Sequence, residues 1–356
     1  IAAVQLSLTT FLGGFAVGQL FWGPLADRFG RKRPILISLS IFILASVACM
    51  YVTSVEQLWV ARFIQALGGC GGVVISRAVV TDYFDSSKTL KIFTLLALIM
   101  SVAPIVGPLI GNGILSVWSW RAVFGTMLIL GVMLFLLSLF FLPETRAKQN
   151  RKPVGNVVRN YLNILKVRQF TWYALIAGVA NGALMVYVGN APFLIMEYGG
   201  LSGNAFSIIF AVNAAGLMVA SYLVNVLQRY TTTPKVVKYA LGVMFTVSVI
   251  LLAAMYFNAS IYLILILLFF FIFPIGILFP ATTELAMKPF TDNSGAASAL
   301  FGSIQLLIAF LCTLLAGFFN DNTIFSIGLA FVMCGIMALF FVFSGKERNT
   351  IPVPFR

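Results

Sequence analysis

Long apolar runs separated by short polar segments dominate this chain. Eleven of the runs approach the roughly 20 residues that an α-helix needs to cross a bilayer. They cover residues 3–22, 35–54, 57–79, 90–115, 121–141, 170–193, 204–228, 236–257, 260–284, 295–319 and 324–344. The pattern predicts an all-α polytopic membrane protein, with Pro274, Gly276 and Pro280 breaking one of its helices.

One long polar stretch interrupts the pattern, from Pro143 to Arg168, and it separates five predicted spans from six. The predicted organisation therefore has four parts. They are an N-terminal helical half (residues 1–142), a cytoplasmic central loop (143–168), a C-terminal helical half (169–345) and a cytoplasmic tail (346–356).

Basic residues concentrate in alternate connections of the predicted bundle. By the positive-inside rule this basic side is cytoplasmic, and it includes the C-terminus. The first run then travels inward, so we expect a further helix before it. In this interpretation the chain holds 11 of 12 transmembrane helices, as in transporters built from two pseudo-symmetric six-helix halves. The basic connections are 23–34, 80–91, 143–168, 229–238, 285–294 and the tail.

Composition supports a membrane protein and excludes several classes of function. Hydrophobic residues make up 61% of the chain, the mean hydropathy is +1.03, and charged residues are 9%, against about 25% in soluble domains. The net charge of +13 follows from the cytoplasmic connections, so nucleic acid is not the expected partner. With no His, no cluster of cysteines and no clustered acids, we expect no enzyme activity, no bound metal and no cofactor. The cysteines lie singly in apolar runs and read as buried hydrophobes, namely Cys49, Cys70, Cys312 and Cys334.

The first polar connection, "GPLADRFGRKRP", carries five charges in seven residues. An ordinary basic loop would satisfy the positive-inside rule, but it would need neither paired glycines nor an acid at this place. The copy expected in the second half, "LQRYTTTPKVV", keeps only Arg229 of the pattern. The candidate residues of the first connection are Gly23, Asp27, Arg28, Gly30, Arg31 and Lys32.

Arg62 lies about five residues inside an otherwise apolar predicted span, three residues before Gln65. An Arg within a membrane costs roughly 2.5–3.5 kcal/mol on insertion scales, so it should face a cavity or a partner. The alternative is an arginine that extends toward the outer headgroups.

The span that holds "SVAPIVGPLIGNG" has two prolines that allow a bend and a small-residue face for close helix contact. Its candidate residues are Ser101, Pro104, Gly107, Pro108 and Gly111.

These motifs resemble those of the major facilitator superfamily. The first connection resembles the loop that latches the two halves together on the cytoplasmic side. The resemblance implies that Asp27 caps a helix that starts near Ser294, and that Arg31 pairs with Asp82. It ties Arg62 to proton coupling. "G-P-x-x-G" with an upstream proline resembles the motif of proton antiporters, which implies export.

Five further stretches look like the bicyclomycin- and chloramphenicol-resistance branch of the drug:proton antiporters. They are residues 4–34, which end in "GRKRP", and the stretches "WSWRAVF", "LPET", "GNAPFL" and "GAASALFGSIQ". The resemblance implies a monomeric, proton-driven exporter of small amphiphilic drugs in the bacterial inner membrane, working by alternating access. It also places the proton-carrying acid on the expected helix upstream of Ile1. An exporter of an endogenous siderophore, sugar or peptide, or a non-transporting membrane receptor, is the alternative.

A substrate is expected near the midplane, where the two halves meet. Such pockets are mostly apolar and hold a few polar groups. Aromatic and Met side chains could equally serve packing or lipid contact, whereas an amide that faces lipid is expensive. The candidates are Gln65, Met100, Ser101, Tyr187, Asn190, Phe193, Asn213, Phe273 and Gln305.

Overall fold

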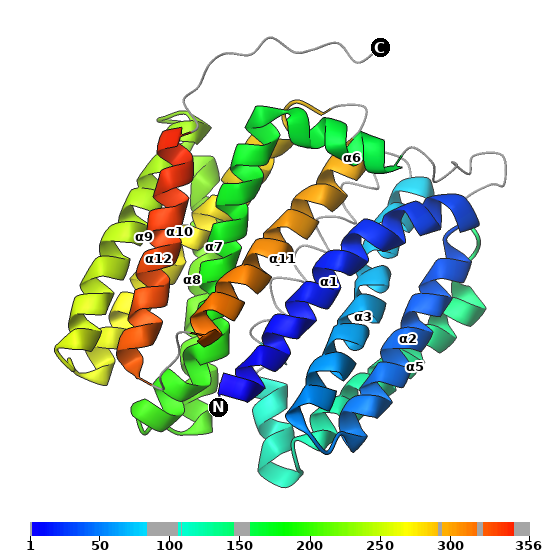
Figure 1. Cartoon of the computed structure of the whole chain (residues 1–356), viewed down its shortest axis with the longest axis horizontal. Coiled ribbons are helices and arrows are strands. Elements are labelled where there is room, and N and C mark those ends of the chain that lie inside the picture. Colours follow the sequence, from blue (N-terminus) through cyan, green and yellow to red (C-terminus); the bar gives the residue numbers. More distant parts are fainter. Residues whose placement is uncertain are drawn as a thin grey trace. The chain divides into compact units, whose positions relative to one another are not determined.

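A computed structural model of the chain describes residues 2–83, 106–107, 109–145, 157–290, 294–318 and 323–344. Every regular element within these ranges is a helix (Figure 1). The all-α fold class is therefore confirmed. By their internal contacts the residues form two compact units. Unit 1 comprises Ile1–Arg159 and Gly189–Ala215, and unit 2 comprises Asn160–Val188 and Gly216–Arg356.

Unit 1 is built around one central helix. Helix α3 (Val55–Tyr83) packs against α1 (Ala2–Phe29) on one side and α2 (Lys32–Tyr51) on another, and α2 in turn packs against α5 (Arg121–Phe141). The apolar side chains between α1, α2 and α3 form a buried cluster. Its members are Trp22, Ala26, Ile35, Leu39, Cys70 and Ile75.

Glycines allow the helices of unit 1 to approach closely. A Cβ at Gly68 would lie 2.5 Å from the backbone nitrogen of Phe42 and 2.8 Å from the carbonyl oxygen of Ser38. This is the small-residue packing expected between helices in a bilayer, where lipid tails remove the hydrophobic incentive to associate. The indole Nε1 of Trp22 donates to the carbonyl oxygen of Leu67 at 2.7 Å, which ties α1 to α3 at the same level.

Unit 2 contains α9 to α12, most of α6 and α7, and the part of α8 that follows Ala215. Helix α9 packs against both α10 and α12, and α11 contacts α10 and α12. The elements from residue 157 onward are α6 (Val157–Lys166), α7 (Arg168–Pro192), the π-helix η3 (Phe193–Tyr198), α8 (Gly203–Leu227), α9 (Thr233–Tyr256), α10 (Ile261–Met287), α11 (Ser294–Phe318) and α12 (Ile324–Ser344).

Eight helices in the described ranges are long and apolar enough to span a bilayer. Helix α5 shows what surrounds them, because Gly131 is its single buried residue and apolar side chains such as Phe140 and Phe141 are largely exposed. Such a surface requires lipid as its solvent. The spans are Lys32–Tyr51, Val55–Val80, Arg121–Phe141, Arg168–Tyr198, Gly203–Leu227, Thr233–Tyr256, Ile261–Met287 and Ala296–Phe318.

Three segments differ from the sequence-based expectation. Most of the predicted connection 23–34 is helical, because α1 continues to Phe29 and α2 begins at Lys32. Gly30 makes the turn between them with φ +89°, a conformation that glycine adopts without a steric penalty. The central polar stretch contains α6, whose Ile164 is buried. Helix α10 runs unbroken past Pro274 and Pro280, since neighbouring turns maintain the helix where a proline removes one hydrogen bond.

Candidate functional site

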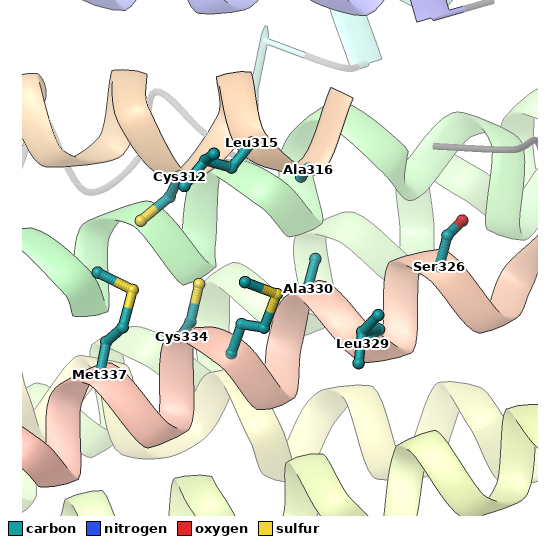
Figure 2. Close-up of a pocket in the computed structure, with 9 residues that line it drawn as sticks. Cys312, Leu315, Ala316, Ser326, Leu329, Ala330, Cys334 and Met337 are labelled. Carbon is teal, nitrogen blue, oxygen red and sulfur yellow. The ribbon is translucent and has the colours of Figure 1, made fainter. Parts of the chain in front are cut away.

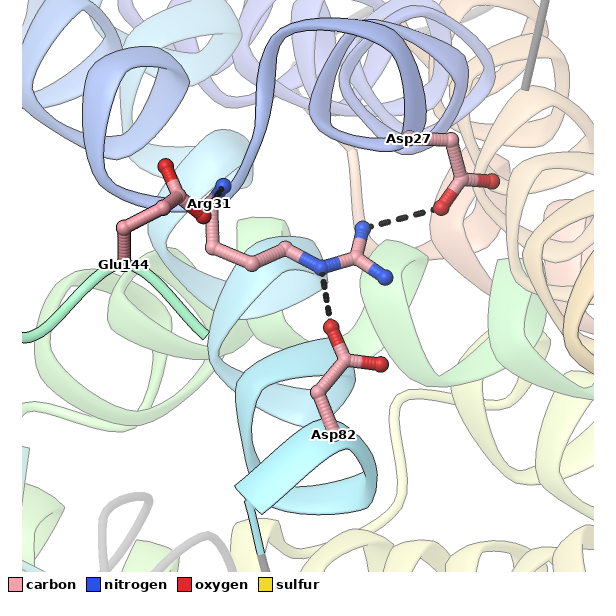
Figure 3. Close-up of polar contacts among 4 residues, drawn as sticks. All are labelled: Asp27, Arg31, Asp82 and Glu144. Atoms are coloured by element: carbon pink, nitrogen blue, oxygen red, sulfur yellow. Dashed lines mark hydrogen bonds and ion pairs between the residues drawn. The ribbon is translucent and has the colours of Figure 1, made fainter. Parts of the chain in front are cut away.

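Arg31 gathers three carboxylates at the end of unit 1 where α1 meets α2 (Figure 3). Its Nη1 donates to Oδ1 of Asp27 at 2.9 Å, and its Nε donates to Oδ2 of Asp82 at 2.6 Å. Its backbone N–H donates to Oε1 of Glu144 at 2.7 Å. We call these four residues the Arg31 cluster. The cluster connects the end of α1, the start of α2, the last turn of α3 and the segment that follows α5.

The burial of the Arg31 side chain makes its charged partners and their geometry important. The Arg31 side chain is 4% exposed, whereas Asp27 and Asp82 are 42% and 21% exposed. A buried guanidinium needs charged partners in good geometry, because removing one partner leaves an uncompensated charge. Two different guanidinium nitrogens serve two carboxylates, which the single ammonium group of a lysine could not do in the same fixed geometry.

The other candidate residues of the first connection lie on the same two helices or in the turn between them. Gly23 lies inside α1, Arg28 is exposed in its last turn, and Lys32 opens α2. Glu144 was not among the sequence candidates, although it belongs to the quoted stretch "LPET". Nothing local in that stretch indicates that its carboxylate accepts from a residue 113 positions earlier. Helix α11 begins at Ser294 in unit 2, and the capping role implied for Asp27 stays a prediction.

Arg62 begins a chain of polar contacts inside unit 1. Its Nη1 donates to Oε1 of Gln65 at 2.7 Å, and Nε2 of Gln65 donates to Oγ of Ser46 at 2.8 Å. The guanidinium carbon also lies 4.3 Å from the ring centre of Phe11 and 5.8 Å from that of Phe124. Aromatic faces attract a desolvated cation. Within the ranges that the structure describes, no carboxylate lies within ion-pair distance of Arg62.

Gln65 makes structural contacts that the sequence did not predict. The side chain is completely buried, and both ends of its amide are occupied by Arg62 and Ser46. A substrate that touched Gln65 would first have to displace one of these partners. In this conformation Gln65 therefore orients Arg62 and connects α3 to α2.

The remaining cavity candidates are divided between the units. Asn190, Phe193 and Asn213 belong to unit 1, and Tyr187, Phe273 and Gln305 belong to unit 2. The amide side chains of Asn190 and Asn213 are 7% and 5% exposed, and both have interaction partners, as the cost of an amide in lipid requires. Met100, Ser101, Pro104 and Pro108 lie outside the described residues.

Gly107 and Gly111 lie on a helical stretch of unit 1. A Cβ built at either glycine would meet no atom within 4 Å, so the described residues show no close helix contact on this face. The packing predicted for this small-residue face stays a prediction. Farther along the same stretch, Nδ2 of Asn112 donates to Oδ1 of Asn204 at 2.9 Å.

A counterpart of the Arg31 cluster, with uncharged donors in place of the arginine, lies in unit 2. Glu284, in the last turn of α10, accepts from Nε2 of Gln228 at 2.5 Å and from Oγ1 of Thr233 at 3.3 Å. These two partners flank the α8–α9 turn, where the sequence copy of the first connection is weak. Glu284 at the end of α10 thus corresponds to Asp82 at the end of α3. An amide and a hydroxyl group stand in unit 2 where unit 1 has the arginine.

The comparison with protein families decides the identity of the fold. The Major Facilitator Superfamily profile matches residues 1–311. The chain belongs to the Major Facilitator Superfamily. It is therefore a transport protein of the membrane and not an enzyme, as the absence of nucleophile and metal motifs in the sequence predicted.

Similar proteins refine the position within the superfamily. The uncharacterised MFS-type transporter YdgK of Bacillus subtilis is 33% identical over 350 residues, which are 97% of this chain and 87% of that protein. The bicyclomycin resistance protein homolog of Haemophilus influenzae is 28% identical, with 97% and 88% covered. The multidrug transporter MdfA of Yersinia pestis is 27% identical, with 86% and 75% covered. The resemblance to the drug-exporter branch is confirmed by these relatives.

Solved structures support the same fold. The D-xylose-proton symporter superposes with a TM-score of 0.79, covering 99% of this chain and 88% of that one at 16% sequence identity. At this identity the likeness concerns the fold alone. The major facilitator fold predicted from the pattern of apolar runs and motifs is confirmed.

Proposed function

We propose that this transporter exports small amphiphilic drugs across the bacterial inner membrane in exchange for protons. The observation that carries the proposal is Arg62, an arginine inside the apolar helix α3 that is held by Gln65 and two aromatic rings. Intramembrane charges are expensive and mark ion pathways. The names of the relatives from Haemophilus influenzae and Yersinia pestis support a drug as the cargo.

Arg62 is the proposed coupling residue. A positive charge near a carboxyl group lowers the pKa of that group, and burial raises it, so a conformational change can load and release a proton. The fixed orientation of the guanidinium by Gln65 would keep its distance to such a group constant within each conformation. The proton gradient is the proposed energy source, with no cofactor or metal needed for transport.

The Arg31 cluster is the proposed latch of the alternating-access cycle. The positive-inside rule, applied to the basic connections, supports a cytoplasmic position for the cluster and for the C-terminus. Breaking the two ion pairs in each cycle costs little free energy, because water can solvate the partly exposed Asp27 and Asp82 when Arg31 leaves. The substrate is proposed to bind as a single small molecule to a monomer, with the cavity candidates other than Gln65 as its contacts.

The proposal is tested with the full chain in proteoliposomes. An imposed proton gradient should drive uptake or release of radiolabelled chloramphenicol in the direction opposite to proton flow, and a protonophore should abolish it. Arg62→Ala should lose gradient-driven transport while drug binding remains measurable. Arg33→Ala, at an exposed position of α2, is the matched control and should transport normally.

The outcome separates the rival functions. Gradient-driven transport of extracted metabolites without any drug transport would identify an exporter of an endogenous compound. No transport of either kind by a folded, drug-binding protein would indicate a receptor. Proton-driven drug transport that survives Arg62→Ala would remove the coupling role from Arg62.

A further inference from the structure

A small pocket between α11 and α12 of unit 2 is unusually rich in sulfur (Figure 2). Its lining includes Cys312 from α11 and Met333, Cys334 and Met337 from α12. Its volume is about 30 Å³. A cavity of about 10–15 Å³ already accommodates one water-sized guest. Two thiols and two thioethers therefore border a space large enough for a single ion.

The helical spacing explains why these sulfurs converge. Met333, Cys334 and Met337 lie within four residues of one another and share one face of α12. Cys312 is pressed against α7, where a Cβ at Gly182 would lie 2.6 Å from its Sγ. Figure 2 shows the thiols of Cys312 and Cys334 directed from the two helices toward the space between them, next to the sulfur of Met337.

The two thiols are close neighbours in a nearly dry environment. Cys312 is 6% exposed and Cys334 is 4% exposed, and both line the same small pocket. Both are free cysteines. The sequence predicts that all four cysteines serve only packing, because each lies in an apolar run. Cys312 and Cys334 are 22 positions apart and lie on different helices. Their meeting is a property of the tertiary structure.

We infer that Cys312 and Cys334, assisted by Met333 and Met337, form a binding site for one soft monovalent cation, Cu(I) or Ag(I). Thiolate and thioether ligands select such ions over hard ones. The pocket lining in the described part of the chain includes no carboxylate, so magnesium and calcium lack their preferred oxygen ligands. Tetrahedral zinc usually requires several thiolates or imidazoles, and the chain contains no His.

Charge balance determines the form of the site. When the cation enters, one thiol loses its proton to water, and the thiolate and the monovalent cation together are neutral. The second thiol and the thioethers bind as neutral donors. A second ionisation would leave a net negative charge in the low-dielectric interior, which is strongly unfavourable. The site is therefore expected to release one proton for each cation bound.

Binding is measured on the purified full chain in detergent or nanodiscs. Cu(I) is supplied from a chromophoric chelator under anaerobic conditions, and Ag(I) is titrated calorimetrically in chloride-free buffer. We expect one equivalent bound, with release of one proton. Cys312→Ser and Cys334→Ser should each abolish the tight site. Met337→Leu should weaken binding by about tenfold or more, the range seen when a supporting contact at a metal site is removed.

Cys49→Ser is the matched control, because Cys49 is also buried but lies among Val52, Ala61, Leu58 and Phe124. It should bind like the wild type. A readout that needs no variant follows the slow alkylation of these buried thiols by a small membrane-permeant maleimide in detergent. Bound Ag(I) should slow the reaction at Cys312 and Cys334 and leave the rates at Cys49 and Cys70 unchanged. Equal binding by the Cys312→Ser/Cys334→Ser double variant and the wild type would overturn the inference, as would protection of Cys49 and Cys70 instead.

Discussion

At the scale of single residues, Arg31 and Arg62 show two ways of keeping a guanidinium in an apolar protein. Arg31 is neutralised by two aspartates, and Arg62 is surrounded by an amide oxygen and aromatic rings. The ion-paired arrangement stabilises the conformation in which the ends of α1 and α3 meet the start of α2. Arg62 has no carboxylate partner in the described ranges. Its charge can therefore act on an ionisable group in the proposed transport cycle.

Replacing Arg31 should damage both stability and transport. Arg31→Met removes both ion pairs, and we expect it to lower the free energy of unfolding by less than the roughly 3–5 kcal/mol that breaking a fully buried pair costs. The cost is reduced because Asp27 and Asp82 keep access to solvent, at 42% and 21% exposure. Thermal unfolding of the purified protein measures the effect.

Arg31→Lys separates charge from geometry. It keeps the positive charge but cannot hold both carboxylates with two fixed nitrogens, so it should fall between the wild type and Arg31→Met. Arg33→Ala supplies the baseline for removing a nearby exposed charge. An Arg31→Met protein as stable and active as the wild type would show that the Arg31 cluster contributes nothing.

At the scale of elements, the sequence indicated the helices well and their ends poorly. Hydropathy reports the part of a helix inside the bilayer, and α1 and α3 both extend past it to Phe29 and Tyr83. The extension matters because it brings Asp27 and Asp82 within reach of Arg31. Helix α6 was missed for a related reason, since a surface helix has no long apolar run.

The packing of α2 on α3 can be tested with two glycines of the same helix. Gly68→Ala places a methyl group against the backbone of Phe42 and Ser38, and such overpacking typically costs about 1–3 kcal/mol. Gly72→Ala meets no atom within 4 Å and should be neutral or slightly stabilising, because alanine favours helices. Thermal unfolding compares the two. Equal destabilisation would mean that α2 and α3 do not approach closely at Gly68.

At the scale of the whole molecule, the orientation in the membrane that the basic connections predict is open to a direct test. It can be tested at two exposed tyrosines, Tyr51 at the end of α2 and Tyr230 in the α8–α9 turn, which are 76% and 84% exposed. In intact cells, a membrane-impermeant maleimide should label Tyr51→Cys but not Tyr230→Cys. Permeabilised cells should show labelling of both.

The background for the labelling test is favourable, because the four native cysteines are buried. The unsubstituted protein therefore serves as its own negative control. Labelling of Tyr230→Cys but not Tyr51→Cys in intact cells would reverse the orientation and place the Arg31 cluster outside.

The sequence by itself determined the helical spans, the superfamily and the importance of the first connection, because hydrophobic length, charge bias and local spacing are properties of neighbouring residues. The tertiary structure alone decided which distant side chains meet. Glu144 joins Arg31 across 113 positions, Ser46 meets Gln65, and two cysteines that look isolated share one pocket. These contacts depend on how helices are rotated and how closely their backbones approach, and no single run of residues encodes either quantity.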